Sequence, residues 1–493
     1  MDFKIKPYAH QMKAIEIAMN RNELGLLWEM GAGKTGAAIN IMRLKFAMEK
    51  RIMRTLIVSP LVTLNNWKKE VLMHSKINLS DIVVSPQGTD KILKELVKRL
   101  YDEEQQMLFK SKILIINYES VRSPKILEAL ISWGPEFIIA DECHRIKSHK
   151  ASQSKAMVKL GDGAKYRLML SGTPVLNKPF DIYNQFRFLD KGATFGRNIS
   201  VFMNTYMIDE NASWAAKDNH FAKYELNPRK AEELTDLIGR KCYRISKAEA
   251  LPDLPPLIKK SYELIMSPSM RKHYEEMLKN YITFVVDLKG KNTNNAVVAQ
   301  TAMTKALRLL QITSGILSDE AGAVSLIHDN PKIEAVSNLL TEIVLEAGNK
   351  CILWCCFIAD YAQLSTLCEK LEIDYRFIRG EDNLAAKSKA IEDFDSDPNV
   401  KVMIANRRAG GIGINMVKAK YSIVYSRNFS LEDELQSEAR NHRGGSEIHD
   451  SIVKIDLFFK DTIEGATLEA LRSKQNMADK ILDLSFTTLY NNN

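Results

Sequence analysis

Residues 24–35 read LGLLWEMGAGKT, and the chain continues with GAAINIMRLKFAMEK at 36–50. The first stretch is an apolar run that ends in a glycine-rich turn, and the second is compatible with a helix. A glycine-rich turn that opens a helix points backbone N–H groups at an anion, and the helix dipole adds to the attraction. The stretch therefore predicts a phosphate-binding loop between a strand and a helix.

Each residue of this loop has an expected role. Gly31, Ala32 and Gly33 let the backbone approach the phosphates. Lys34 is expected to reach the β- and γ-phosphates, and the Thr35 hydroxyl to bind Mg²⁺. The general phosphate-loop pattern has glycine where this chain has Trp28, so the match is incomplete. The competing interpretation is a chance Gly-Lys-Thr at the start of a helix.

Short apolar runs rich in β-branched residues recur in the first and the last part of the sequence, and each is followed by a helical segment. Runs that are apolar throughout suit strands buried on both faces of a parallel sheet, and their alternation with helices indicates right-handed βαβ units. They are TLIVSP at 55–60, KILIINYE at 112–119, FIIADE at 137–142 and RLMLSGTP at 167–174, then KCILWCCF at 350–357, DYRFIRG at 374–380, KVMIANR at 401–407 and YSIVYSR at 421–427. The fold class is therefore α/β, with two parallel-sheet lobes.

The domain boundaries follow from what lies between these runs. We expect the first lobe at 1–190, a helical insertion at 191–250, a proline-rich connector with a second helical insertion at 251–330, and the second lobe at 331–493. The connector is LPDLPP at 251–256, which cannot continue a helix. The amphipathic segments 268–288 and 295–317 predict helices, and the polar stretch DLKGKNTNNA between them predicts a loop.

Composition excludes some classes of protein. Of 493 residues, 45% are apolar and 26% charged, which is typical of globular proteins rather than disordered ones, and the net charge of +8 leans only mildly towards a polyanionic partner. No apolar run is long enough to span a bilayer or to direct export. We therefore expect no membrane association and a cytoplasmic protein, nuclear if the host is eukaryotic. The six cysteines are expected to be reduced thiols of the core.

A pair of carboxylates follows the apolar run FIIA. Asp141 and Glu142 come at the carboxyl end of a predicted buried strand, where α/β sheets bind ligands. ATP hydrolysis needs one carboxylate to hold Mg²⁺ and a base to orient the attacking water. Asp141 suits the first role and Glu142 the second. An Asp-Glu pair alone is common on protein surfaces, but together with the phosphate-binding loop it predicts ATP hydrolysis.

At this point the chain resembles the Swi/Snf-like ATPases of helicase superfamily 2 along nearly its whole length. The matching stretches stand in the family's order: PYAHQ at 7–11 (the adenine-reading Q motif), WEMGAGKT at 28–35 (motif I), LIVSPLVTLNNWKKE at 56–70 (Ia), INYES at 116–120 (Ib), DECHRIKS at 141–148 (II), LSGTPVLNKPFDIYNQFRFL at 170–189 (III), RISKAEALPDLPP at 244–256, ANRRAGGIGINM at 405–416 (V) and QSEARNHRGG at 436–445 (VI). The resemblance implies two RecA-like lobes that use ATP and Mg²⁺.

The resemblance also implies roles for further residues. Gln11 would contact the adenine base, and Arg440 and Arg443 would act as arginine fingers from the second lobe, on one face if that segment is helical. DNA would be held mainly by its phosphates, because a motor must step without reading sequence. The candidate contacts are Ser59, Pro60 and Asn65 in the first lobe and Arg379, Gly380, Arg407, Arg408 and Gly410 in the second.

Several positions depart from the family pattern or stay open. Trp28 is expected to pack on or near the nucleotide, and Trp67 is either a DNA contact or core packing. Arg407 and Arg408 stand in place of the family's threonine and basic residue, which predicts a more electrostatic grip on DNA. Ser426 stands where aspartate is usual. Cys143 replaces the commoner alanine and Ser446 a frequent glutamine.

The function expected from the resemblance is a DNA-dependent ATPase that translocates on double-stranded DNA and remodels branched DNA, through fork reversal, branch migration or annealing. Alternatives are a motor that displaces proteins from DNA, a conventional strand-separating DNA or RNA helicase, and a catalytically silent scaffold. The intact Lys34, Asp141, Glu142 and two arginines argue against a scaffold. We expect a monomer, with any protein partner bound through residues 191–330.

Overall fold

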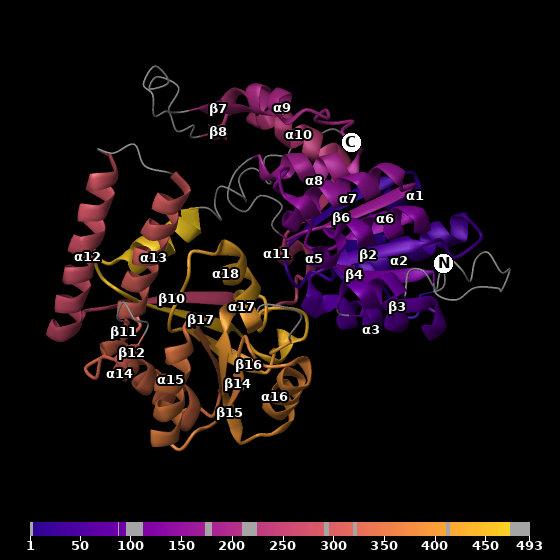
Figure 1. Ribbon diagram of the computed structural model, residues 1–493. Helices are drawn as coiled ribbons and strands as arrows, with labels where there is room; N and C mark the ends of the chain where they lie inside the picture. Colours follow the sequence, from indigo (N-terminus) through magenta and orange to yellow (C-terminus); the bar gives the residue numbers. More distant parts are fainter. Residues whose placement is uncertain are drawn as a thin grey trace. The chain divides into compact units, whose positions relative to one another are not determined.

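The computed structural model describes residues 3–86, 88–94, 112–172, 180–209, 224–289, 295–318, 323–410 and 415–473. Two compact units divide the chain between Pro252 and Asp253, and Figure 1 shows strands with helices packed on both sides in each unit. All eight apolar runs quoted above contain a strand, as predicted. The fold is therefore α/β with two RecA-like lobes.

The first unit is built on a seven-stranded sheet in the order β3-β4-β2-β5-β6-β1-β9. Every pairing in it is parallel. The strands are β1 (Glu23–Trp28), β2 (Thr55–Ser59), β3 (Ile82–Val84), β4 (Ile113–Asn117), β5 (Phe137–Ala140), β6 (Tyr166–Leu170) and β9 (Cys242–Ile245). Because all strands run the same way, the loops that follow β1 and β5 emerge at one edge, separated only by β6.

The helices of this unit cover both faces of the sheet. They are α1 (Ala9–Met19), α2 (Lys34–Met48), α3 (Leu64–His74), α5 (Tyr118–Val121), α6 (Pro124–Trp133), α7 (Ser152–Gly163), α8 (Asp181–Leu189), α9 (Ile199–Tyr206), α10 (Ala231–Lys241) and α11 (Lys247–Ala250), with short turns η1 (Leu61–Thr63), η2 (Leu79–Asp81), η3 (Cys143–Ile146) and η5 (Pro228–Lys230). From β1 to β3 the chain proceeds towards one edge of the sheet, and from β4 to β6 it returns towards the other edge. Since parallel crossovers are right-handed, α2 and α3 cover one face and α6, α7 and α8 the other.

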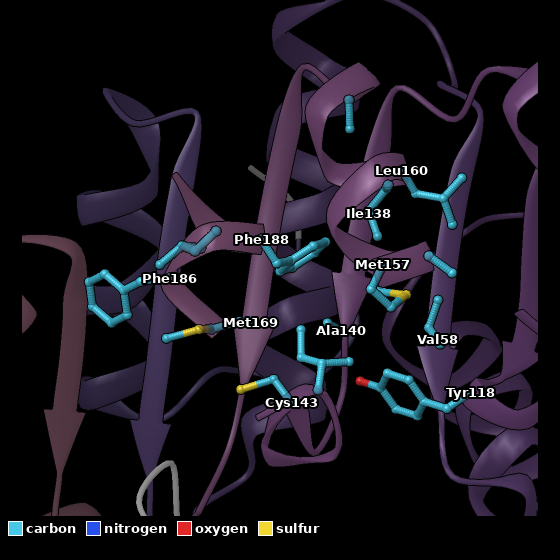
Figure 2. Packing of buried hydrophobic residues seen from close by; sticks show 14 of the residues in the cluster. Val58, Tyr118, Ile138, Ala140, Cys143, Met157, Leu160, Met169, Phe186 and Phe188 are labelled. Carbon is cyan, nitrogen blue, oxygen red and sulfur yellow. The ribbon is translucent and has the colours of Figure 1, made fainter. Parts of the chain in front are cut away.

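Buried hydrophobic side chains fill the space between the sheet and the layer formed by α6, α7 and α8. Figure 2 shows Met157 and Leu160 of α7 packed beside Ile138 of β5, with Cys143 and Met169 in the same cluster. The four strands at its centre are buried along their whole length, which explains their unbroken apolar runs. This packing fixes the ends of β2 and β5.

The segment 191–250 is more than the helical insertion expected from the sequence. It contains α9 and α10 but also the hairpin β7 (Met207–Asp209) and β8 (Tyr224–Leu226). Near its end, before the short helix α11, strand β9 pairs with β1 at the edge of the first sheet. The first unit consequently continues beyond residue 190. A four-residue strand at a sheet edge lacks the long apolar run that marks the central strands.

The second unit is built on a six-stranded parallel sheet in the order β10-β17-β16-β13-β15-β14. Its strands are β10 (Leu257–Leu264), β13 (Lys350–Cys355), β14 (Asp374–Ile378), β15 (Val400–Asn406), β16 (Ala419–Val424) and β17 (Ile452–Phe459), and a separate hairpin joins β11 (Ile316–Ser318) to β12 (Val324–Leu326). Strand β10 comes directly after the proline-rich connector, so this part of 251–330 belongs to the second sheet.

The helices of the second unit include the two predicted from the amphipathic segments. They are α12 (Pro268–Lys289), α13 (Asn295–Thr313), α14 (Pro331–Leu340), α15 (Ile358–Lys370), α16 (Leu384–Ser396), α17 (Arg407–Gly410) and α18 (Leu431–Glu438), with a π-helical turn η6 (Thr341–Glu346) and η7 (Ser446–Ile448). Helices α14 and α15 pack on one face of the sheet and α16 on the other. The polar loop predicted between α12 and α13 lies largely outside the described residues.

All six cysteines are free, and five of them are buried, which fits their assignment to the core. Among the residues that the structure describes, no helix is long and apolar enough to cross a membrane.

Candidate active site

The glycine-rich loop adopts the conformation that its sequence predicts. Strand β1 ends at Trp28 and helix α2 begins at Lys34. Gly31 and Gly33 have φ angles of 88° and 76°, the left-handed region that favours glycine. A Cβ atom on Gly33 would lie 2.6 Å from Gln11 Nε2. Both glycines are therefore required, one by backbone conformation and the other by conformation and space.

The Lys34 ammonium lies inside this loop. It donates to the carbonyl oxygens of Trp28 at 2.9 Å and Glu29 at 3.3 Å, and the residue is buried. An ammonium has three N–H donors, so these bonds aim the side chain without using its full capacity. Thr35 follows in the first turn of α2 and is half-buried.

The first turn of α1 holds the loop through two side chains, Gln11 and His10. Gln11 Nε2 donates to Gly33 O at 2.9 Å, and its Oε1 accepts from Tyr8 N. His10 Nε2 bonds Ala32 O at 2.9 Å, and burial lowers the pKa of His10 although that bond opposes the shift. The structure thus brings Gln11 to the loop, while its contact with adenine stays a prediction. His10 was not predicted to lie at the site, and its position next to Gln11 was the available signal.

The two carboxylates follow β5, at the same sheet edge as the loop. Asp141 Oδ2 accepts from Trp67 Nε1 at 2.8 Å, and its Oδ1 accepts from Glu142 N at 3.0 Å. Burial raises the pKa of Asp141 to about 6; the Glu142 charge adds to the rise, and the Trp67 hydrogen bond and the Lys34 charge oppose it. The Asp141 carboxylate is therefore a buried anion that the protein alone compensates incompletely.

Glu142 has a strained backbone. Its φ of 49° places a non-glycine residue in the left-handed region, a strain that is characteristic of functional sites. Its Oε2 is buried and lies 3.4 Å from His144 Nδ1, and within the described part of the chain it accepts no hydrogen bond. This geometry presents a carboxylate oxygen with unused acceptor capacity beside Asp141.

Two tryptophans of the quoted motifs belong to the core. Trp67 is 1% exposed and donates a hydrogen bond to Asp141. Of the two alternatives for Trp67, a DNA contact or core packing, the structure favours core packing. Trp28 is fully buried, edge-on to the rings of His10 and Tyr243. Its side chain packs in the core next to the loop, and its carbonyl oxygen accepts a hydrogen bond from the Lys34 ammonium. The expected packing of Trp28 on or near the nucleotide stays a prediction.

The residues present fit a magnesium ion that is held with phosphates. Thr35 and Asp141 are the candidate protein ligands, and a divalent cation would offset the uncompensated Asp141 charge. No cluster of three or more His, Cys, Asp or Glu side chains suited to a metal occurs among the described residues. Mg²⁺ commonly uses one or two carboxylates together with substrate phosphates, so this small ligand set suits it.

The raised pKa of Asp141 gives a prediction about stability. Because the folded-state pKa is above the unfolded value, the contribution of Asp141 to stability is present below about pH 4 and is lost as pH rises through about 6. Asp141→Asn should therefore raise the melting temperature of the metal-free protein at pH 7.5 by about 5 °C, a gain that vanishes near pH 4. Thermal denaturation at both pH values measures this.

Asp162→Asn is the matched control. Asp162 forms a hydrogen-bonded ion pair with Arg187, which lowers the pKa of Asp162, so its replacement should lower the melting temperature at pH 7.5. A melting temperature that falls for both variants at pH 7.5 would contradict the uncompensated charge at Asp141.

The first-lobe candidates for DNA contact differ in exposure. Ser59 ends β2 and is fully buried, and Pro60 is buried with its carbonyl oxygen bound to Thr63. Burial prevents the Ser59 side chain from reaching a phosphate in this conformation. Asn65, in the first turn of α3, is exposed.

Arg407, expected at the DNA, is instead buried. It is 0% exposed and pairs with Glu434 at 2.5 Å, so the expectation of an electrostatic grip through Arg407 is wrong for this structure. Arg408 is exposed in the same short helix α17, which Gly410 ends. Residues 411–414 of motif V and 173–179 of motif III lie outside the described residues.

Arg379 and Gly380 lie at the end of β14. The Arg379 guanidinium stacks 3.9 Å from the Phe377 ring centroid, and its backbone N–H donates to Asp382. Gly380 is exposed. The aromatic platform orients Arg379 while leaving it half-buried, which suits a positioned cation.

The two motif VI arginines are not on one helical face. Helix α18 ends at Glu438, and Arg440 and Arg443 lie in the turns that follow, before Gly445 at a φ of 101°. Arg440 is buried and its Nε donates to Gln436 O at 3.0 Å, whereas Arg443 is half-buried. Helical spacing therefore does not place these two side chains, and the turn after α18 does.

The departures from the family pattern are accommodated locally. Ser426 is buried, donates to Asp360 Oδ2 at 2.6 Å and accepts from Cys356 N at 2.8 Å. Cys143 Sγ donates to Gln185 Oε1, and Ser446 is fully buried. Ser426 thus joins the loop after β13 to the end of β16.

Comparison with known proteins identifies the family of this chain. The model of the SNF2-related domain matches residues 10–316, and that of the helicase conserved C-terminal domain matches residues 331–445. An uncharacterized ATP-dependent helicase of Mycoplasma genitalium is 25% identical over 95% of this chain and 41% of its own length. The ATP-dependent helicase brm of Drosophila melanogaster is 27% identical over 96% of this chain and 29% of its own length.

The chain thus spans less than half the length of these curated relatives. Among solved structures, the Sulfolobus solfataricus SWI2/SNF2 ATPase core in complex with double-stranded DNA is 21% identical, covering 97% of this chain and 93% of that chain with a TM-score of 0.41. A CHD3-type chromatin-remodeling factor of Arabidopsis thaliana is 23% identical over 90% of this chain and 32% of its own length.

Proposed function

This chain belongs to the SNF2-related family, as an ATPase of the helicase type, and we propose that it uses ATP hydrolysis to move along double-stranded DNA. One observation carries the chemical part of the proposal. The buried Asp141 and the half-buried Glu142 lie at the same sheet edge as the Lys34 loop, close enough for the Lys34 charge to lower the pKa of Asp141. The residues proposed to bind phosphate and Mg²⁺ and to orient water thus lie at one edge of the first sheet.

The roles in hydrolysis follow from this geometry. The backbone N–H groups of the loop and the Lys34 ammonium would hold the phosphates. Thr35 and Asp141 would hold Mg²⁺, which would supply positive charge to the phosphate oxygens. Glu142 orients the attacking water and accepts its proton. Arg440 and Arg443 supply positive charge to the transferred phosphoryl group when the second lobe reaches the nucleotide. Hydrolysis would then require a particular lobe arrangement and could drive movement.

DNA would be held through its backbone. Of the residues expected there, Asn65 and Arg408 are exposed, and Arg379 is held on an aromatic platform. Phosphate contacts of this kind carry no sequence information and permit stepping. These three residues therefore support a grip on DNA that does not depend on base sequence.

We propose branched DNA as the substrate that this motor remodels, in replication, recombination or repair. A second candidate is displacement of proteins from DNA, favoured by relatives that are named as chromatin-remodeling factors. Strand separation is the outcome that would exclude both.

The test is the steady-state ATPase rate without nucleic acid and with single strands, linear duplex, forked duplex or RNA. We expect duplex DNA to raise kcat on the order of tenfold or more, and forks to raise it further. Stimulation by single strands or RNA alone would contradict duplex translocation. Stimulation by protein-bound duplex above naked forks would favour the second candidate.

A further inference from the structure

Arg407 is tied to the helix that precedes the motif VI arginines. It begins α17, and its Nη2 donates to Glu434 Oε2 at 2.5 Å and to Ser437 Oγ at 3.3 Å, both on α18. Arg407 is 0% exposed, and Glu434 and Ser437 are also buried. Two elements far apart in sequence are therefore joined by a charged bond away from bulk solvent, where a charge pair is weakly screened.

Glu434 is also bound from the sheet. Its Oε1 accepts from Lys454 Nζ on β17, and Lys454 also contacts Glu438 at 3.2 Å. Lys259 on β10 pairs with the same Glu438 at 2.9 Å. Burial opposes ionisation of Glu434, but the charges of Arg407 and Lys454 hold its pKa well below the usual range. Cations and carboxylates thus alternate from α17 through α18 to the edge of the sheet.

The segment that α18 leads into is the turn with Arg440 and Arg443. Arg440 O accepts from Met416 N at 3.0 Å, so the last residue of motif V also contacts this turn. Asn441 Nδ2 donates to Ala419 O at 3.2 Å. Arg408, a proposed DNA contact, follows Arg407 directly. The Arg407–Glu434 bond therefore lies between the proposed DNA-binding residues and the proposed arginine fingers, all within the second unit.

We propose that Arg407 is a positioning residue, which holds α18 and the Arg440–Arg443 turn in a fixed relation to the segment that begins at Arg408. It thereby couples duplex binding to hydrolysis without touching either DNA or nucleotide. The inference rests on the proposed function. It differs from the sequence expectation, which placed Arg407 on the DNA, and it assigns that task to Arg408 alone of the two arginines.

The test compares three variants of the full chain. Arg407→Met breaks the pair and leaves Glu434 with Lys454 only. Arg407→Lys keeps the charge but loses the guanidinium, whose Nη2 alone donates to both Glu434 and Ser437. Lys332→Met is the matched control, because Lys332 is an equally buried cation whose ammonium pairs with Glu464 at 2.7 Å, outside the α17–α18 connection.

Basal and duplex-stimulated kcat, KM for ATP and duplex affinity without nucleotide are measured for each. Arg407→Met should lower stimulated kcat about tenfold, with duplex affinity changed less than about twofold. Arg407→Lys should fall between Arg407→Met and wild type; if the methionine variant does not fold, a lysine variant with about threefold lower stimulated kcat supports the proposal. Lys332→Met should melt at a lower temperature but keep the wild-type ratio of stimulated to basal kcat.

Two results would overturn the proposal. One is weaker duplex binding by Arg407→Met with unchanged kcat at saturating DNA, which would make Arg407 a DNA contact. The other is a fall in stimulation no larger than that of Lys332→Met, which would make its role only structural. If no nucleic acid stimulates the wild type, the proposed function fails, and the basal kcat of Arg407→Met against Lys332→Met still tests the positioning role.

Discussion

Glu142→Gln should lower the ATPase rate by about 10²- to 10⁴-fold while ATP binding stays close to that of the wild type. The substitution keeps the shape of the side chain but removes the proton acceptor. It leaves the loop of Gly31 to Lys34 and the Asp141–Trp67 hydrogen bond intact, so phosphate and metal binding should persist. Steady-state hydrolysis and equilibrium binding of a fluorescent ATP analogue measure the two effects separately.

The control for this prediction is Glu128→Gln, the same change at an exposed position of α6. It should leave both hydrolysis and binding unchanged. A Glu142→Gln protein that hydrolyses ATP within about tenfold of the wild type would show that another group orients the water. One that loses ATP binding would instead assign Glu142 to the nucleotide site itself.

Alanine at Arg443 should lower DNA-stimulated kcat by about 10³-fold or more, with little change in melting temperature. The proposed task of Arg443, which is half-buried, is charge stabilisation of the transferred phosphoryl group. Arg440→Ala should cause a comparable loss of kcat and also lower the melting temperature, because Arg440 is buried and bonds the Gln436 carbonyl oxygen. Steady-state hydrolysis at saturating ATP and duplex DNA gives the kcat values.

Arg376→Ala serves as the control, since Arg376 pairs with Asp393 in the same lobe but outside motif VI. It should preserve kcat. If Arg443→Ala and Arg440→Ala raise KM for ATP and leave kcat unchanged, they bind the ground state and are not arginine fingers.

The central strands and the phosphate-binding loop were predictable because each depends on local sequence. An apolar run such as FIIA can be stable only where both faces of a strand are covered, and Gly31 and Gly33 are needed wherever the backbone turns tightly. The short strand β3 and the buried strand β17 were not among the predicted strands, although β17 is mostly apolar and lies between β10 and β16. Strands β9 and β10 were missed because each pairs at a sheet edge, and β10 has six exposed residues. Nothing in their composition distinguishes them from connecting segments.

The site could be predicted only in part, because several of its contacts join residues that are far apart in the sequence. The hydrogen bond from Trp67 to Asp141 spans 74 positions, and the motif alone left Trp67 undecided between DNA and core. Arg407 shows the same limit more sharply. A basic residue in motif V resembles a DNA contact until Glu434, 27 positions later, is known to lie beside it. Residue types predict which chemical roles are available, but the partner of each side chain depends on the fold.

The most direct test of the proposed motor is displacement of a third strand from a DNA triplex on a long duplex. A protein that tracks duplex DNA should release the third strand with ATP while the two duplex strands stay paired, and Glu142→Gln should not release it. Duplex-stimulated ATP hydrolysis without release of the third strand, or release accompanied by separation of the duplex strands, would contradict translocation on double-stranded DNA.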